Sequence, residues 1–262
     1  MPLKINKKVK IIRLAPQGVQ VPEITYIKDG KRIVVQGAIH IADQKFYENI
    51  IDKIKGFSGE THLEGIINTD PQYENEKILL NSVYEIMSAY GNIAYQKDYI
   101  NKNIVDNKKV FNYDLTDVEL GDAVFDEKTL NELKQLVKNI KNKLSKNNTI
   151  LNIGSSPLFN VLISAIGISN VSLNNENVIL HQRNKFAIDQ ALNTDNDVFL
   201  FWGTKHIEGM NDLLLDEGFT IEQIRWKTAI RTLRLKKNHH KRKELIQHRL
   251  NIVEQTLLNI DD

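Results

Sequence analysis

Two short segments of this sequence repeat one another, and each ends in a histidine. Residues 33–36 are Ile-Val-Val-Gln and lead into Gly37-Ala38-Ile39-His40, while residues 199–202 are Phe-Leu-Phe-Trp and lead into Gly203-Thr204-Lys205-His206. Each segment is therefore a strand-like run, a glycine, two further residues and a histidine, followed by a helical pattern. An imidazole can exchange a proton near neutral pH or bind a metal ion, so the pair suggests acid–base or metal-assisted chemistry.

The repeated pattern also predicts where the two histidines lie. A glycine permits a tight exit from a strand and lets a ligand approach the backbone. Open α/β sheets bind ligands beyond the carboxyl ends of their strands. If the two strands run parallel in one sheet, His40 and His206 face the same crevice. A single histidine at a strand end more often has a structural role, and only the matched pair favours a site.

Two other segments carry groups suited to the same chemistry. Glu64 lies in the apolar stretch 61–67, which we expect to be a short buried strand, and a carboxylate there needs a cation, a metal or a reacting substrate. Arg183 and Asn184 lie in a predicted helix, 177–192. The forked guanidinium of arginine suits a carboxylate or a developing oxyanion.

These residues allow two mechanisms. Two imidazoles and one carboxylate match the ligands of catalytic zinc sites, which makes His40, Glu64 and His206 candidate ligands for a divalent metal such as Mn, Co or Zn. Asp114 would then orient a histidine. Without a metal, His40 or His206 would be the general base and Glu64 its partner.

The elements that position these residues alternate between strands and helices. Strands are expected at 9–14, 23–27, 31–36, 61–67, 109–113 and 197–202, with a hairpin at Asp29-Gly30. Helices are expected at 44–55, 74–95, 126–144, 157–166, 177–192 and 208–215. We therefore predict an α/β fold with a layered mixed sheet, residues 1–235 as one domain, and residues 236–262 as a basic arm and a C-terminal amphipathic helix.

Composition excludes several classes of protein. The sequence has no cysteine, so disulfides, thiolate metal sites and thiol nucleophiles are excluded. Its N-terminal apolar stretch is broken by Lys10 and Arg13, unlike a signal peptide, and no stretch reaches the roughly 20 apolar residues of a membrane span. We expect a cytoplasmic protein. Residues 226–243 hold eight Lys and Arg and no acid, but no aromatic stacking platform accompanies them, which argues against nucleic-acid binding.

Four motifs in order resemble those of the TraB/PrgY/GumN family of the Tiki superfamily. They are Gly37-x-x-His40, Leu63-Glu64-Gly65, Ile179-x-x-x-Arg183-Asn184 and Trp202-Gly203-x-x-His206-x-x-Gly209. Residues 112–115, Asn-Tyr-Asp-Leu, resemble a further family segment. The match extends from about residue 31 to 228. The sequence departs from the family in lacking the membrane segments or signal peptide of many members, and in having Lys205 where small residues are common.

The resemblance implies an α/β fold related distantly to erythromycin esterase-like and ChaN-like proteins. It also implies a metal-dependent hydrolase, peptidase-like or esterase-like, that acts on a peptide or ester bond. The implied catalytic residues are His40, Glu64, Arg183 and His206. We also assign Gly37, Asn184, Gly203 and Lys205 to substrate binding.

Two alternatives use other chemistry. A protein that binds and sequesters a peptide or small ligand would use the same crevice without catalysis. A serine hydrolase would need a nucleophile such as Ser156, but Gly-x-Ser-x-Gly is absent and a serine before Pro157 is typical of a helix N-cap.

The C-terminal segment generates a prediction about assembly. Its apolar residues recur at spacings of four and three, in the order Ile246, Leu250, Val253, Leu257 and Ile260. Such a helix needs a packing partner because packing supplies most helix stability. A helix this short usually packs within its own chain, but the basic stretch before it favours a homodimer through this helix. Light scattering should give twice the chain mass, and a chain ending near Asn238 should be monomeric; an unchanged mass after truncation would contradict the prediction.

Overall fold

A computed structural model of the chain describes residues 10–65, 93–104, 109–115 and 176–231, together with single positions 78, 81, 84, 85, 88, 131, 135 and 248. Its helices are α1 (Gln44–Gly56), α3 (Gln96–Ile104), α7 (Glu176–Leu192) and α8 (His206–Asp216). Its strands are β1 (Arg13–Ala15), β2 (Gly18–Lys28), β3 (Lys31–Ala38), β4 (Ile41–Ala42), β5 (Glu60–Leu63), β6 (Ala94–Tyr95), β7 (Val110–Asn112), β8 (Val198–Gly203) and β9 (Thr220–Arg231).

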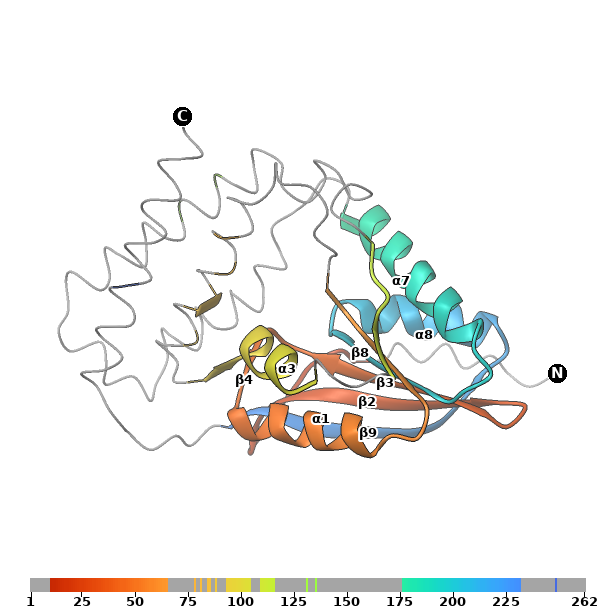
Figure 1. Cartoon of the computed structure of the whole chain (residues 1–262), viewed down its shortest axis with the longest axis horizontal. Coiled ribbons are helices and arrows are strands. Elements are labelled where there is room, and N and C mark those ends of the chain that lie inside the picture. Colours follow the sequence, from red (N-terminus) through yellow and green to blue (C-terminus); the bar gives the residue numbers. More distant parts are fainter. Residues whose placement is uncertain are drawn as a thin grey trace.

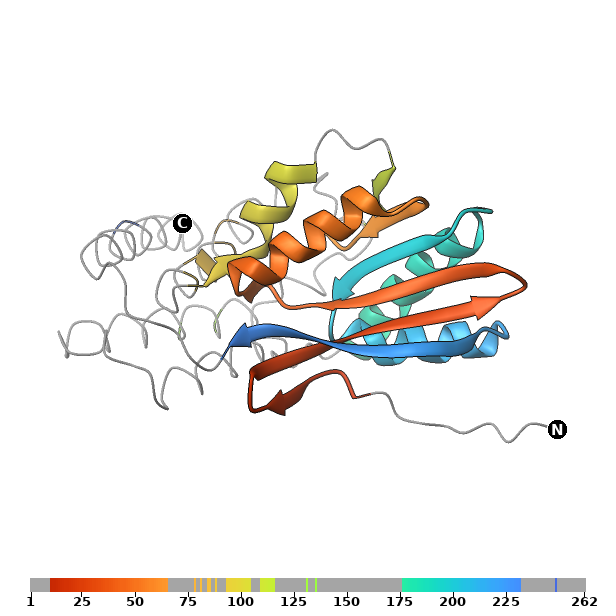
Figure 2. The same ribbon diagram turned by 90° about the horizontal axis from the view of Figure 1, so that it is seen from below.

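The main sheet is mixed, and its parallel part has the order β3-β8-β5-β7. On the other side of β3 lies β2, which pairs antiparallel with β1, β3 and β9. A small separate sheet pairs β4 with β6. The strands lie side by side in Figure 2. The predicted layered α/β fold with a mixed sheet is confirmed, and β3 and β8 are parallel neighbours.

Helices cover both faces of the sheet because the central strands are apolar on both sides. Alternate residues of β8 point to opposite layers: Phe199 and Phe201 join one buried cluster, while Val198, Leu200 and Trp202 join the other. The first cluster includes residues of α1 and α3, and the second includes residues of α7 and α8. Figure 1 shows α1 on one side of the strands and α7 and α8 on the other.

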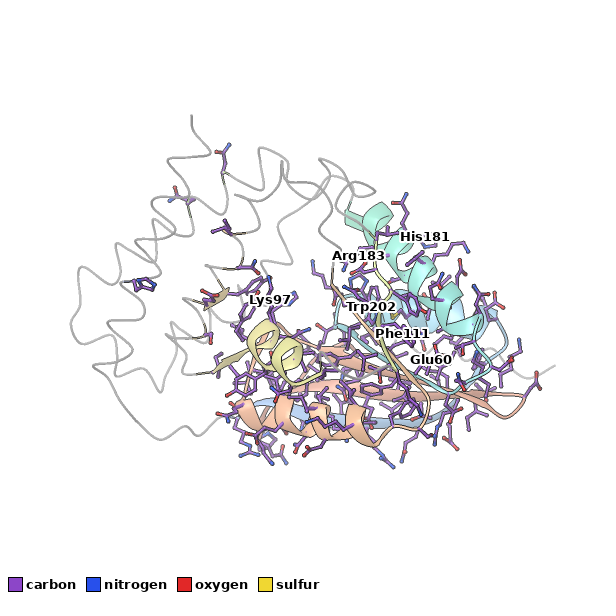
Figure 3. All side chains as sticks on the ribbon, in the orientation of Figure 1. Glu60, Lys97, Phe111, His181, Arg183 and Trp202 are labelled. Atoms are coloured by element: carbon purple, nitrogen blue, oxygen red, sulfur yellow. The ribbon has the colours of Figure 1, made fainter. Side chains whose placement is uncertain are left out.

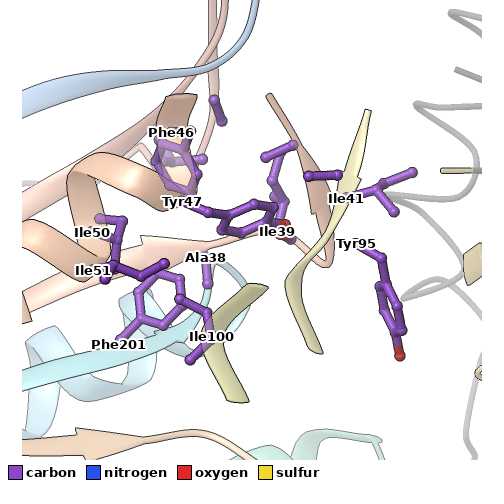
Figure 4. Packing of buried hydrophobic residues seen from close by; sticks show 14 of the residues in the cluster. Ala38, Ile39, Ile41, Phe46, Tyr47, Ile50, Ile51, Tyr95, Ile100 and Phe201 are labelled. Atoms are coloured by element: carbon purple, nitrogen blue, oxygen red, sulfur yellow. Dashed lines mark hydrogen bonds between the residues drawn. The ribbon is translucent and has the colours of Figure 1, made fainter. Parts of the chain in front are cut away.

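Helix α1 forms where the apolar periodicity predicts it. Its buried residues recur at helical spacing and face the sheet beside Ala38 and Phe201 (Figure 4). The Tyr47 hydroxyl donates a hydrogen bond to the Ile39 carbonyl at 2.7 Å, which ties the helix to the backbone just before His40. Gly56 was expected to follow the helix, but it is the last helical residue, and Phe57 in extended conformation is the C-cap.

Several predicted elements are correct in type but wrong in extent. The hairpin turn lies at Asp29-Gly30, where both residues have positive φ, 49° and 85°. Strand β5 ends at Leu63, so Glu64 follows the strand and does not belong to it. Residues 94–95 were assigned to a helix, yet they form β6. Strand β9 and helix α3 were not expected.

Other predictions fall outside the described residues. They are the helix at 126–144, which is described only at positions 131 and 135, the helix at 157–166, the Ser156 alternative, and the C-terminal helix, which is described only at position 248. Among the residues that are described, no helix has the length and apolar character needed to span a membrane.

The close approach of two chain segments before β5 and β8 gives a test of the sheet. A Cβ built on Gly59 would lie 1.9 Å from the Asp197 carbonyl oxygen, and that oxygen accepts the Glu60 N–H at 2.9 Å. Gly59→Ala should therefore lower the free energy of unfolding by about 1–3 kcal/mol, as overpacking typically does. Gly56→Ala is the control, because a Cβ there meets nothing within 4 Å. Denaturant unfolding measures both, and equal stabilities would contradict the register.

Candidate functional site

The carboxyl ends of the four parallel strands bring the chemically distinctive residues to one edge of the sheet. Ala38 is opposite Gly203, and Leu63 is opposite Phe201. His40 follows β3, Glu64 follows β5, Asp114 follows β7 and His206 follows β8. Since parallel strands end on the same side, this register carries all four side chains to that edge.

Arg183 on α7 joins two of these residues. Its Nε donates to Asp114 Oδ1 at 2.9 Å, and its Nη2 donates to Asp114 Oδ2 at 2.6 Å and to Glu64 Oε1 at 2.9 Å. The guanidinium carbon lies 5.6 Å from the centre of the Trp202 ring, and both residues are labelled in Figure 3. Arg183 was expected to bind a substrate carboxylate or an oxyanion, but the structure engages its guanidinium with two carboxylates of the protein.

Asp114 serves this arginine rather than a histidine. Besides the two bonds from Arg183, its carboxylate accepts the Gly65 N–H at 3.0 Å and the Leu115 N–H at 2.8 Å. The residue is 2% exposed. A buried carboxylate needs this number of donors, so Asp114 is a fixed counter-charge. The expectation that it orients a histidine is wrong.

Glu64 is held as an anion. Its Oε2 accepts the Gly203 N–H at 2.5 Å, and a Cβ on Gly203 would lie only 2.9 Å from that oxygen. Burial alone would raise the pKa of Glu64, but the electrostatic influence of the neighbouring His206 and Arg183 outweighs burial and holds that pKa well below its ordinary value. Glycine at 203 is therefore explained by the approach of this carboxylate.

His206 is the first residue of α8 and is buried, at 2% exposed. Its Nδ1 lies 2.6 Å from Asn184 Oδ1, and its Nε2 lies 3.4 Å from Glu64 Oε1. The ring meets Trp202 edge-on, with 5.1 Å between ring centres. Asn184 was assigned to substrate binding, but its side-chain oxygen contacts the histidine.

His40 differs from His206 because it is exposed to solvent. Its ring lies beside Tyr84, with ring centres 4.7 Å apart, and Tyr84 stacks in turn on Tyr95. Desolvation by the surrounding protein lowers the pKa of His40 below its ordinary value. Glu64 opposes this shift, while Arg183 and His206 add to it. The four residues therefore influence one another electrostatically, and His40 is the one open to water.

Two residues assigned to substrate binding remain. A Cβ on Gly37 would lie 3.2 Å from both the Pro22 carbonyl oxygen and Thr204 Cγ2, so close packing is sufficient to explain this glycine. Lys205 is partly buried and occupies the N-cap position of α8. The assignment of these two residues to substrate binding stays a prediction.

The hydrogen bonds that Glu64 already accepts are unfavourable for binding a divalent metal ion. Both Glu64 oxygens already accept hydrogen bonds, and one of them comes from the cationic guanidinium of Arg183. A metal bound to the same oxygen would face that positive charge at close range. Within the described ranges, no three His, Asp or Glu side chains are grouped so that they could hold a metal.

His62 on β5 is a further buried histidine that sequence reasoning did not single out. Its Nε2 lies 3.2 Å from Glu60 Oε2, and its ring packs edge-on against Tyr113. Burial lowers the pKa of His62, with Glu60 acting in the opposite direction. The side chain is completely buried, so His62 is part of the core rather than of the candidate site.

Comparison with known proteins finds no match to this chain among protein-family models, curated proteins or solved structures. The resemblance to the TraB/PrgY/GumN family therefore remains a prediction from the four motifs.

The network around Arg183 predicts a large effect on stability. Arg183→Met keeps the apolar stem but leaves two buried carboxylates without their cation, which should cost about 3–5 kcal/mol of unfolding free energy. Lys185→Met on the same helix is the control: Lys185 pairs with Asp189 at 2.7 Å, but the two side chains are 61% and 48% exposed. That change should stay within about 0.5 kcal/mol. Denaturant unfolding measures both, and a loss below about 1 kcal/mol for Arg183→Met would contradict the network.

Proposed function

We propose that this chain is a hydrolase that cleaves a peptide or ester bond at the carboxyl edge of its parallel strands, in the manner expected of a TraB/Tiki-type protein. The observation that carries the proposal is the contrast between the two matched histidines. His206 is buried against an ionised carboxylate, whereas His40 is exposed to solvent and has a lowered pKa. Such a division is typical of sites where one group exchanges protons with substrate and others are held fixed.

His40 is the general base in this proposal. Because its pKa is lowered, the imidazole is neutral at neutral pH and can accept a proton from a water molecule. The water oxygen then adds to the carbonyl carbon of the substrate. When the bond to the leaving group breaks, the His40 imidazolium returns the proton to the leaving oxygen or nitrogen, so the ring ends as it began.

The negative charge that develops on the carbonyl oxygen needs a positive environment. Arg183 is poorly suited to stabilise this oxyanion, because Asp114 and Glu64 already compensate the positive charge of its guanidinium. The first turn of α8, with Lys205 before it, supplies backbone N–H groups and the positive end of a helix dipole. We assign the oxyanion to this end of the site.

Metal dependence remains a separate prediction. The contacts of Glu64 support the mechanism without a metal, and the motif resemblance supports the mechanism with one. Metal analysis of purified protein, and turnover with a chelator or with added Mn²⁺, Co²⁺ or Zn²⁺, decide between the two mechanisms.

The proposal predicts turnover of peptide or ester libraries that depends on His40. His40→Ala should lower kcat/KM by about 10²- to 10⁴-fold, the usual contribution of a general base. The rate should fall as the pH falls through the lowered pKa of His40, because protonation removes the base, and should be level above it. A pH profile of kcat/KM, measured from pH 4 to 8, tests the sign.

His181→Ala is the matched control, because His181 is an exposed histidine on α7 that takes no part in the network. Its turnover should equal that of the unaltered chain. Equal turnover of His40→Ala would refute the assigned base. Saturable binding of a peptide without any turnover would favour the sequestering protein instead.

A further inference from the structure

Asn184 connects α7 to the imidazole of His206. Asn184 is 3% exposed, and its Oδ1 lies 2.6 Å from His206 Nδ1. An amide oxygen is only an acceptor, so the bond requires the hydrogen to be on Nδ1. The Nε2 atom then faces the Glu64 carboxylate, whose Oε1 is 3.4 Å away.

Gly209 makes room for this amide. A Cβ on Gly209 would lie 2.3 Å from Asn184 Nδ2 and 3.4 Å from its Cγ. Any larger residue at 209 would displace the amide from the histidine one turn before it. The glycine that closes the motif Gly203-x-x-His206-x-x-Gly209 is thus explained by the contact between Asn184 and His206.

Helix packing keeps the amide in place. Apolar side chains of α7 and α8 share one buried cluster, which includes Ala187 and Ile188 of α7 and Ile207 and Met210 of α8. The preceding residue, Arg183, is fixed by Asp114 and Glu64. Two consecutive residues of α7 therefore contact the two sides of this pair: Arg183 binds Glu64, and Asn184 contacts His206.

We propose that Asn184 is a positioning residue that fixes His206 in the form with hydrogen on Nδ1, so that Nε2 is the nitrogen available for proton exchange beside Glu64. Which ring nitrogen of a histidine carries the hydrogen is generally set by the hydrogen bonds that the two nitrogens make, and here Nδ1 makes one with Asn184 Oδ1. His40 lies beside the aromatic ring of Tyr84, whereas His206 contacts the side-chain amide of Asn184, so the surroundings of the two matched histidines differ. The catalytic consequence rests on the proposed function, whereas the hydrogen on Nδ1 does not.

Nitrogen NMR of the full chain with ¹⁵N-labelled histidine tests the proposal without an activity assay. At a pH where the imidazole is neutral, long-range proton–nitrogen correlations should show His206 with hydrogen on Nδ1. Asn184→Leu removes the acceptor and should shift His206 toward hydrogen on Nε2, and Gly209→Ala should do the same by displacing the amide. Asn184→Asp retains an acceptor and should keep hydrogen on Nδ1.

Asn211→Leu is the matched control. Asn211 is also buried, at 3% exposed, but its Oδ1 accepts the Tyr26 hydroxyl at 3.1 Å and does not contact His206. Its His206 resonances should be unchanged. Hydrogen on Nε2 in the unaltered chain, or no shift in Asn184→Leu while Asn184→Asp is folded, would overturn the proposal.

Kinetics separates the two levels of the inference. If the chain is a hydrolase, Asn184→Leu should lower kcat about 10- to 100-fold with little change in KM, as loss of an orienting partner does, and Asn184→Asp should recover most of it. If neither the unaltered chain nor the Asn184 variants turn over substrate, the proposed function is refuted, whereas the NMR test of the hydrogen on Nδ1 remains valid. If the chain turns over substrate but His206 carries its hydrogen on Nε2, the positioning role of Asn184 is refuted and the proposed function is kept.

Discussion

A buried carboxylate that must remain charged determines much of the architecture at this edge of the sheet. Glu64 is 10% exposed, and desolvation works against its ionisation. A backbone N–H from Gly203, the guanidinium of Arg183 and the imidazole of His206 together reverse that effect. Removing any one of these partners would leave an anion in a poorly solvated place, which costs far more than the contact itself contributes.

The need to compensate buried charge applies also to Arg183, the cation that contacts Glu64. Arg183 alone would carry a buried positive charge, and Asp114 with its backbone donors compensates it. The resulting chain of polar contacts runs from Asp114 at the end of β7, through Arg183 of α7, to Glu64 at the end of β5 and His206 at the start of α8. These contacts fix β5, β7, α7 and α8, which are distant in sequence, relative to one another, and a preorganised site needs side chains that are held in this way.

Local patterns predict the local parts of this structure well. The strands before Gly37 and Gly203, helix α1 and the Asp29-Gly30 hairpin depend on nearby residues, and all lie where the sequence indicates. Strand β9 is mostly exposed or partly buried along its length and has no clean alternation, and helix α3 has few apolar residues, so neither has a strong pattern.

The site was predictable as a set of residues and not as a set of roles. Residue types identified His40, Glu64, Arg183 and His206, and the parallel register brings the two histidines and Glu64 to one edge. The sequence could not show that Asp114 would accept hydrogen bonds from Arg183, or that the amide of Asn184 would contact the ring of His206. Those pairings depend on how α7 lies over the sheet, which is a consequence of long-range packing.

The position of β8 has a consequence for how the chain folds. Among the parallel strands, β8 comes last in sequence, yet it lies between β3 and β5. During synthesis β3 and β5 lack the strand that lies between them until residues 198–203, which form β8, leave the ribosome. The parallel sheet must then close by insertion of a late strand into a gap, a high-contact-order step that is intrinsically slow. Until that insertion the edges of β3 and β5 that β8 will occupy have unpaired backbone groups, which are prone to pair with other chains, so the nascent chain is exposed to aggregation for most of its synthesis.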